Sequence, residues 1–202
     1  MNPVTTISGT ATPLDRANVD TDQIMPKQFL KRVERTGYGE FVFWDWKRLP
    51  DGTPDPDFPL NNPDHEGSVI LLTGPNFGSG SSREHAPWGL QDYGFEAVVA
   101  SSFADIFYNN CCNIGLLPVE LHEKEVRWLM ELVEHEPTAQ LTIDLETQTV
   151  TADGFEATFD IDPAKKHRLL RGLDPIGVTL DHADAIDAFE ERRPAWLPTL
   201  TG

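Results

Sequence analysis

The residues best suited to chemistry lie together in one glycine-rich stretch, Gly74–Pro87, which reads GPNFGSGSSREHAP. Gly78 and Gly80 would let the backbone turn tightly and approach a ligand closely. Ser81 and Ser82 supply hydroxyl groups beside the guanidinium group of an arginine. That planar group suits two parallel hydrogen bonds to a carboxylate. The residue types therefore indicate a binding site for a small anion.

The following residues of the motif, Arg83, Glu84 and His85, are expected to lie at the start of a helix. Ser68–Leu72 is typical of a short buried strand, and a helix is predicted over Ser82–Tyr93. The N-terminus of a helix presents unpaired N–H groups and the positive end of its dipole to an anion. In that position, the acid and the histidine could orient the arginine or the serines.

The spacing of the motif excludes three other kinds of glycine-rich loop. It contains no Gly-Lys-Ser/Thr, its glycines do not fall as in a dinucleotide fingerprint, and it lacks Gly-x-Ser-x-Gly. The structural alternative is a serine cap on the helix, followed by a surface Arg–Glu pair. From the residues alone, both interpretations stay open.

The elements that must position this motif form an alternating pattern. After the strand and helix named above, the sequence predicts a strand, a helical stretch and a third strand, at Glu96–Ala100, Phe103–Cys112 and Leu116–Leu121. This order is typical of a parallel α/β unit. Later segments predict an amphipathic helix, a hairpin, a strand and two helices, at Glu123–Glu136, Leu141–Leu145 with Thr149–Thr151, Phe155–Ile161, Asp162–Gly172 and Asp181–Arg192.

The first third of the chain reads as loop-rich, and the proline-rich segment Pro50–Asp64 excludes a regular element there. No linker-like stretch divides the sequence. We therefore expect one domain over residues 1–202, with extended arms at both ends.

Composition excludes several classes of partner. The 202 residues include 33 acidic and 16 basic side chains, and the formal net charge is −17. Such a chain repels phosphate backbones and anionic membrane surfaces, so neither nucleic acid nor membrane is expected as a partner. The N-terminus does not read as a secretory signal, and the longest apolar runs, about five residues, are too short for a membrane span. A cytoplasmic location is expected.

The cysteines and histidines do not indicate a metal site. The two cysteines, Cys111 and Cys112, are adjacent, so they cannot easily pair with each other. Two thiols alone cannot hold a metal cluster, and a packing role in a reducing compartment is expected. Outside the motif, the histidines show no metal-ligand spacing and read as surface or structural residues: His65, His122, His135, His167 and His182. This chain is expected to bind no metal or cofactor of its own.

Four segments resemble one known family. GSGSSREHA at Gly78–Ala86 resembles the signature of the mobile C-terminal domain of the aconitase superfamily. NVDTDQIMPKQFLKR at Asn18–Arg32 is similar to the other characteristic motif of its small-subunit form. RTGYG at Arg35–Gly39 and DIFYNNCCNIGLLPVEL at Asp105–Leu121 resemble bacterial isopropylmalate dehydratase small subunits. The similarity extends over most of the chain, with its motifs in the order of the family.

The resemblance implies a fold, a reaction and a partner. The expected fold is an α/β swivelling domain of β/β/α type, a mixed sheet or barrel core with flanking helices. The expected reaction interconverts 2-isopropylmalate and 3-isopropylmalate through isopropylmaleate, in leucine biosynthesis. The family's 4Fe–4S cluster belongs to the large subunit. That subunit is the expected protein partner, and the dicarboxylate is the expected small-molecule partner.

The resemblance also implies roles for individual residues. Ser81 matches the catalytic base that removes a proton from the carbon next to a carboxylate, and Arg83 with the helix N-terminus would stabilise its alkoxide. Ser82 and Arg83 match carboxylate-binding positions. Lys31 and Arg32 are candidates for a second contact to the substrate, with a solvated charged run as the alternative.

The remaining residues of these motifs are expected to support the site. Glu84 and His85 are expected to hold the turn. Asp20, Thr21 and Asp22 are expected to fix their loop through side-chain-to-backbone hydrogen bonds rather than to contact the substrate.

Two alternatives to this function stay open. The motif would contact only the two carboxylates that related substrates share. The nearest alternative is therefore the small subunit of a related hydro-lyase that acts on citraconate or methylmalate, homoaconitate or dimethylmalate. The second is a non-catalytic module that binds a diacid and regulates a partner.

Overall fold

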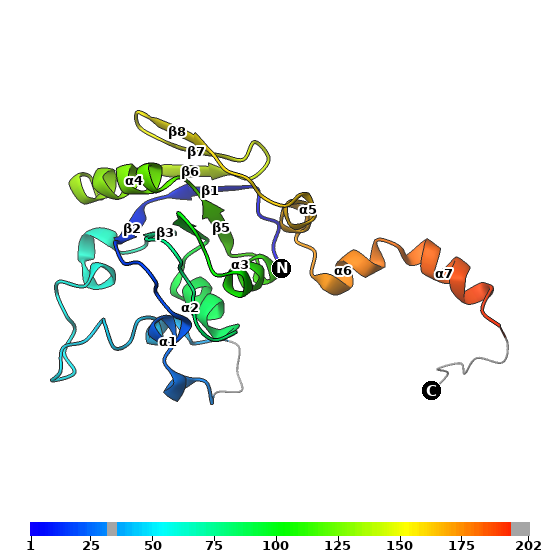
Figure 1. Ribbon diagram of the computed structural model, residues 1–202, viewed down its shortest axis with the longest axis horizontal. Helices are drawn as coiled ribbons and strands as arrows, with labels where there is room; N and C mark the ends of the chain where they lie inside the picture. Colours follow the sequence, from blue (N-terminus) through cyan, green and yellow to red (C-terminus); the bar gives the residue numbers. More distant parts are fainter. Residues whose placement is uncertain (32–35, 195–202) are drawn as a thin grey trace.

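The computed structural model describes residues 1–31 and 36–194, without the side chain of Pro175. Within these residues, eight strands form two four-stranded sheets (Figure 1). One sheet is antiparallel, in the order β1-β6-β7-β8, and the other is parallel, in the order β2-β3-β4-β5. The strands are β1 (Thr6–Gly9), β2 (Ala11–Leu14), β3 (Ile70–Thr73), β4 (Ala97–Ala100), β5 (Leu117–Glu120), β6 (Leu141–Asp144), β7 (Thr149–Ala152) and β8 (Phe155–Thr158).

The helices join and cover these strands. They are α1 (Thr21–Ile24), α2 (His85–Tyr93), α3 (Asp105–Ile114), α4 (Glu123–His135), α5 (Pro163–Arg171), α6 (Pro175–Leu180) and α7 (Ala183–Glu191). Four short 3-10 helices lie in the N-terminal third: η1 (Lys27–Phe29), η2 (Gly39–Phe41), η3 (Pro59–Asn61) and η4 (Pro63–His65). The predicted parallel α/β unit is confirmed as β3-α2-β4-α3-β5.

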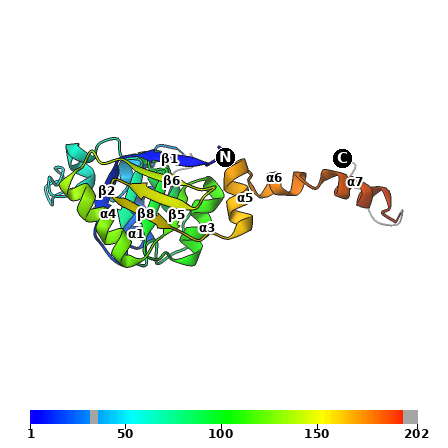
Figure 2. The same ribbon diagram turned by 90° about the horizontal axis from the view of Figure 1, so that it is seen from above.

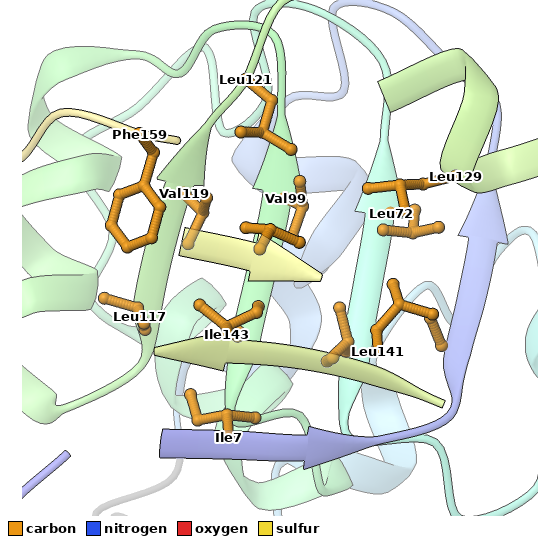
Figure 3. Close-up of a cluster of buried hydrophobic side chains, with 14 of the residues drawn as sticks. Ile7, Leu72, Val99, Leu117, Val119, Leu121, Leu129, Leu141, Ile143 and Phe159 are labelled. Atoms are coloured by element: carbon orange, nitrogen blue, oxygen red, sulfur yellow. The ribbon is translucent and has the colours of Figure 1, made fainter. Parts of the chain in front are cut away.

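The parallel sheet is the middle layer of the fold. Its strands β2, β3 and β4 are buried on both faces, which explains the apolar runs of β3 and β4. On one face, Leu72 and Val99 pack against Ile7 and Ile143 of the antiparallel sheet (Figure 3). The apolar stripe of α4, which includes Leu129, joins the same cluster. This layer of side chains fixes the two sheets against each other.

The opposite face of the parallel sheet packs against α2 and α3. Leu71 of β3 and Val98 of β4 share a second buried cluster with Leu90 and Phe107 of these helices. The fold therefore has three layers in space: the antiparallel sheet, the parallel sheet, and the helices α2 and α3. This arrangement confirms the predicted β/β/α type of mixed fold.

The N-terminal third contains more regular structure than the sequence predicted. β1 and β2 were not predicted, because their sequences, TISG and ATPL, have no continuous apolar run and their partners, β6 and β3, lie far along the chain. In the proline-rich segment, the only elements are η3 and η4, as its composition requires. Phe58 and Leu60 anchor this segment by inserting into the second cluster.

The C-terminal region leaves the body of the molecule after α5. Figures 1 and 2 show α6 and α7 leading away from the sheets in succession. The predicted final helix over Asp181–Arg192 is confirmed as α7, and a further short helix, α6, precedes it. None of the helices in the described ranges is long and apolar enough to cross a membrane.

His65, at the end of η4, is a buried titratable side chain. Only 9% of its surface is exposed, and its Nδ1 has no hydrogen-bond partner among the described residues. Burial lowers the pKa of His65 from its usual 6.5, while the charges of Asp64 and Glu134 and a hydrogen bond to the backbone of Ala11 act in the opposite direction. The folded protein therefore prefers the neutral imidazole.

This preference predicts a pH dependence of stability. Because the folded-state pKa is lowered, the contribution of His65 is fully present above pH 6.5 and is lost as the pH falls through the folded-state value. Urea unfolding at pH 7.5, 6.5 and 5.5 should show a larger acid-induced loss of unfolding free energy for the wild type than for His65→Gln, which cannot titrate there. Parallel profiles for the two proteins would contradict this assignment.

Candidate active site

Two loops that are far apart in the sequence lie side by side at one edge of the parallel sheet. We call Gly78–Arg83 the serine loop, which follows β3, and Asn18–Asp22 the aspartate loop, which follows β2. β2 and β3 are parallel neighbours, and their last residues, Leu14 and Thr73, are paired. Because parallel strands end at the same edge of a sheet, both loops begin there, where α/β folds commonly place their ligands.

Hydrogen bonds join the two loops directly. The carbonyl of Val19 accepts from the N–H groups of Gly78 (2.8 Å) and Ser79 (3.2 Å). In the other direction, Thr21 donates its N–H to the carbonyl of Ser79 (2.8 Å) and its Oγ1 hydroxyl to the carbonyl of Ser81 (2.9 Å). The backbone at Ser81 is thus fixed, while its side chain lies in an exposed part of the loop.

The aspartate loop is also fixed from within. Asp20 accepts from the N–H of Gln23 at 2.8 Å, and the side-chain oxygen of Gln23 accepts from the N–H of Asp20 at 2.9 Å. This reciprocal pair is a capping box, and it starts α1. The segment expected to be a loop therefore ends in the first residues of the short helix α1.

Arg83 is held by a carboxylate of the other loop. It forms an ion pair with Asp22, and only 13% of the arginine side chain is exposed. The Nζ atom of Lys27 lies 3.5 Å from the second oxygen of the same carboxylate. Asp22 thus lies between two cations, one largely buried and one exposed. An arginine carries five N–H donors, so the pair leaves part of the guanidinium fork for another carboxylate.

Helix α2 begins later than the sequence predicted. Its first residue is His85 and its N-cap is Glu84, so the predicted start at Ser82 was wrong. The carbonyls of Ser79 and Ser81 accept hydrogen bonds from Thr21, which holds this segment against the aspartate loop and outside the helix. The serines therefore precede α2 and do not cap it. Their hydroxyls make no hydrogen bond to the described residues at the helix start.

His85, at the start of α2, contacts aromatic side chains and does not take part in the ion pair between Arg83 and Asp22. His85 contacts the aromatic rings of Tyr38 and Trp88, with ring centroids 5.4 and 4.8 Å apart. Burial lowers the pKa of His85, Glu84 raises it, and the charge of Arg83 lowers it further. The group that orients Arg83 is Asp22, a partner that the sequence did not indicate.

The expected second cationic contact is only partly described. Lys31 is exposed and forms no ion pair with the serine loop within residues 1–31 and 36–194, and Arg32 lies outside these ranges. The cation that the fold brings to the site is Lys27, which sequence reasoning missed. In the sequence, Lys27 stands within the quoted segment Asn18–Arg32, one residue after Pro26.

Gly78 is the point at which the serine loop crosses α3. Its φ angle is +76°, and a Cβ atom built there would lie 2.1 Å from Cγ of Phe107. Phe107 is buried in the second cluster and cannot move freely. Only glycine therefore allows the loop to pass this close to the helix.

We expect Gly78→Ala to lower the unfolding free energy by about 2–4 kcal/mol, because strain at positive φ adds to a core clash. Gly154→Ala is the matched control, since Gly154 has φ +69° but nothing within 4 Å of the added Cβ. The control should lose only about 1 kcal/mol in the same urea titration. Equal losses for the two variants would show that Phe107 moves aside.

The two cysteines lie inside α3 and are both buried. Burial raises the pKa of the Cys112 thiol to about 11 and that of Cys111 well above its usual value. Both thiols are therefore protonated at neutral pH and pack in the core. Within the part of the chain that the structure describes, no group of three or more His, Cys, Asp or Glu side chains could hold a metal ion.

The fold and the paired loops correspond to a known class of domain. Residues 1–124 match the profile of the aconitase C-terminal domain, residues 129–163 match the profile LeuD_N, and residues 176–202 match the profile for the C-terminal domain of 3-isopropylmalate dehydratase small subunits. A crystal structure of 3-isopropylmalate dehydratase from Methanocaldococcus jannaschii superposes with a TM-score of 0.63 at 25% identity, covering 92% of this chain and 99% of that one.

Sequence relatives narrow the class further. The 3-isopropylmalate dehydratase small subunit of Halalkalibacterium halodurans is 58% identical over 96% of this chain and 100% of its own. Those of Rubrobacter xylanophilus (53% identical, 99% and 100% covered) and Neisseria meningitidis (54% identical, 99% of both) are similar over the same length. The chain belongs to the family of 3-isopropylmalate dehydratase small subunits, which are subunits of a hydro-lyase.

Proposed function

We propose that this chain completes the active site of a two-subunit hydro-lyase that interconverts 2-isopropylmalate and 3-isopropylmalate through isopropylmaleate. The proposed location is the cytoplasm, and the proposed partner is a large subunit that carries a 4Fe–4S cluster. The observation that carries the proposal is the arrangement of Ser81 and Arg83 on a loop whose backbone and guanidinium are both fixed by the aspartate loop.

The cluster belongs to the partner in this proposal. The described residues of this chain do not suit it, because its two thiols are adjacent, buried and protonated. On the large subunit it would act as a Lewis acid toward the leaving hydroxyl group. The steps assigned to this chain involve its own side chains alone.

Ser81 is the proposed base. Its Oγ would take the proton from the substrate carbon that lies next to a carboxylate, and would return a proton when water adds back in the opposite orientation. A serine hydroxyl is a weak base unless its alkoxide is strongly stabilised. Arg83 supplies a guanidinium group two residues away on the same loop, and its N–H donors that are not paired with Asp22 would stabilise the alkoxide.

Charge also favours the binding of a dicarboxylate at this place. The chain as a whole carries −17, which repels an anionic substrate at long range. At the two loops, however, Arg83 and the nearby Lys27 offset the carboxylates of Asp20 and Asp22, so the substrate does not meet the negative charge of the whole chain there. Ser82, next to Arg83, is the proposed neutral donor to a substrate carboxylate. Lys31 and Arg32 remain proposed second contacts to the substrate.

The test is anaerobic turnover of 3-isopropylmalate by this chain, alone and mixed with the cluster-loaded large subunit of the same organism. We expect activity only in the mixture. Turnover of citraconate or homoaconitate instead would keep the chemistry and change the substrate. Assembly without turnover of any of these acids would contradict the catalytic proposal and favour a regulatory diacid-binding module.

A further inference from the structure

The C-terminal arm, residues 175–194, carries three large hydrophobic side chains that are exposed to solvent. Ile176, Leu180 and Phe189 are 68%, 63% and 65% exposed, and they are three of the six large hydrophobic side chains that lie exposed in the described ranges. Ile176 and Leu180 are four residues apart on α6, so they share one face of that helix. Solvent is an unfavourable environment for a row of such side chains.

Within the described ranges, the side-chain hydrogen bond and ion pairs that join the arm to α5 are made by Asp181, between α6 and α7. Asp181 accepts from Nη1 of Arg171 at 3.3 Å and lies 4.0 Å from Nε2 of His167. Beyond this point, Figures 1 and 2 show α7 lying away from the sheets and from the helices that cover them. α6 has six residues and α7 has nine. Isolated helices shorter than about 12–15 residues are marginal in water, so these two require a surface to pack against.

The charge of the arm argues against a second copy of this chain as that surface. The arm has five carboxylates, Asp181, Asp184, Asp187, Glu190 and Glu191, against two arginines, Arg192 and Arg193, which both follow α7. On α7, Asp184, Asp187 and Glu191 form a stripe opposite Ile186 and Phe189. Two copies that each carry −17 would repel each other across such a contact. The complementary surface is an apolar groove with a neutral or basic rim.

We propose that the C-terminal arm docks through Ile176, Leu180 and Phe189 into such a groove on the large subunit, and thereby holds the two subunits together. This inference rests on the proposed function, which supplies the partner. The arm is distinct from the serine and aspartate loops, so it contributes to assembly and not to the chemical step.

The test compares the wild type with the triple variant Ile176→Ser/Leu180→Ser/Phe189→Ser. This chain is titrated into a fixed amount of cluster-loaded large subunit, and activity is followed. We expect the concentration for half-maximal activity to rise at least ~100-fold, because three large apolar side chains no longer become buried. At saturation, kcat should stay within about twofold of the wild type. Leu49→Ser is the control, since Leu49 is also exposed (41%) but lies in the loop region before η3; its half-maximal concentration should not change.

Hydrogen exchange in the arm distinguishes the surfaces that could cover it: the large subunit, the body of the same chain, or a second copy of the chain. In the isolated chain, residues 175–191 should exchange rapidly at every concentration, and they should become protected when the large subunit is added. Protection in the isolated monomer would show that the arm folds onto its own body, and protection that grows with concentration would show a second copy. Either result, or wild-type affinity in the triple variant, would overturn the inference.

The two proposals can fail separately. If the wild-type subunits assemble and turn over no diacid, the proposed function fails, while arm protection in that complex still supports docking. If the wild-type complex is active and the triple variant assembles normally, only the docking inference fails. Wild-type subunits that do not assemble at all would overturn both.

Discussion

Replacing Ser81 by alanine is expected to lower kcat of the assembled complex by about 10²–10⁴-fold, the range typical for loss of a general base. KM should change little, because the hydroxyl's proposed contribution is made mainly in the transition state. The fold should be unaffected, since the hydrogen bond that fixes this position uses the carbonyl of Ser81 and not its side chain. Anaerobic steady-state kinetics with an excess of large subunit measures the effect.

The matched control is Ser8→Ala. Ser8 lies in β1 and bonds to Thr142 Oγ1 at 2.9 Å, far from the serine loop in the sequence and on the other sheet. Its loss should leave kcat and KM unchanged. If Ser81→Ala retained wild-type turnover in a complex shown to be assembled, another group would be the base, and the assignment of the serine loop as the catalytic loop would fail.

Replacing Arg83 by lysine is the second large effect that we expect. Lysine keeps the positive charge, so Asp22 still has a cation beside it, but it loses the planar fork. A substrate carboxylate can then no longer form two parallel hydrogen bonds, and the alkoxide of Ser81 is less well stabilised. We expect kcat/KM to fall by about 10²–10³-fold, as when one transition-state donor is removed.

Arg168→Lys controls for the substitution itself. Arg168 of α5 donates to Oδ1 of Asn113 in α3 at 2.9 Å, outside the two loops, and should tolerate lysine without loss of kcat/KM. Urea unfolding of both variants separates catalysis from folding. If the activity of Arg83→Lys fell only in proportion to a loss of folded protein, Arg83 would serve to hold Asp22 and would not act on the substrate.

Much of the fold could be predicted from the sequence, because much of it is encoded locally. The unit from β3 to β5 follows from short apolar runs alternating with helical patterns. The start of α5 follows from Asp162, which caps the helix by accepting from two N–H groups, with Pro163 in its first turn. At its other end Gly172 adopts the left-handed conformation that ends helices. Each of these signals lies within a few residues of its effect.

The sequence by itself also determined the family and the chemical character of the site, because serine, arginine and glycine stand together in one motif. Only the tertiary structure decided what holds that motif. The pairing of Asp22 with Arg83, the nearby charge of Lys27 and the contact of Gly78 with Phe107 all join segments that no local pattern relates. β2 and β3 bring these segments together by pairing in parallel, and long-range pairing depends on the packing of the whole sheet rather than on local preference. For the same reason, the late start of α2 could not be predicted: the carbonyls of the serine loop bond to Thr21, which lies in a different part of the chain.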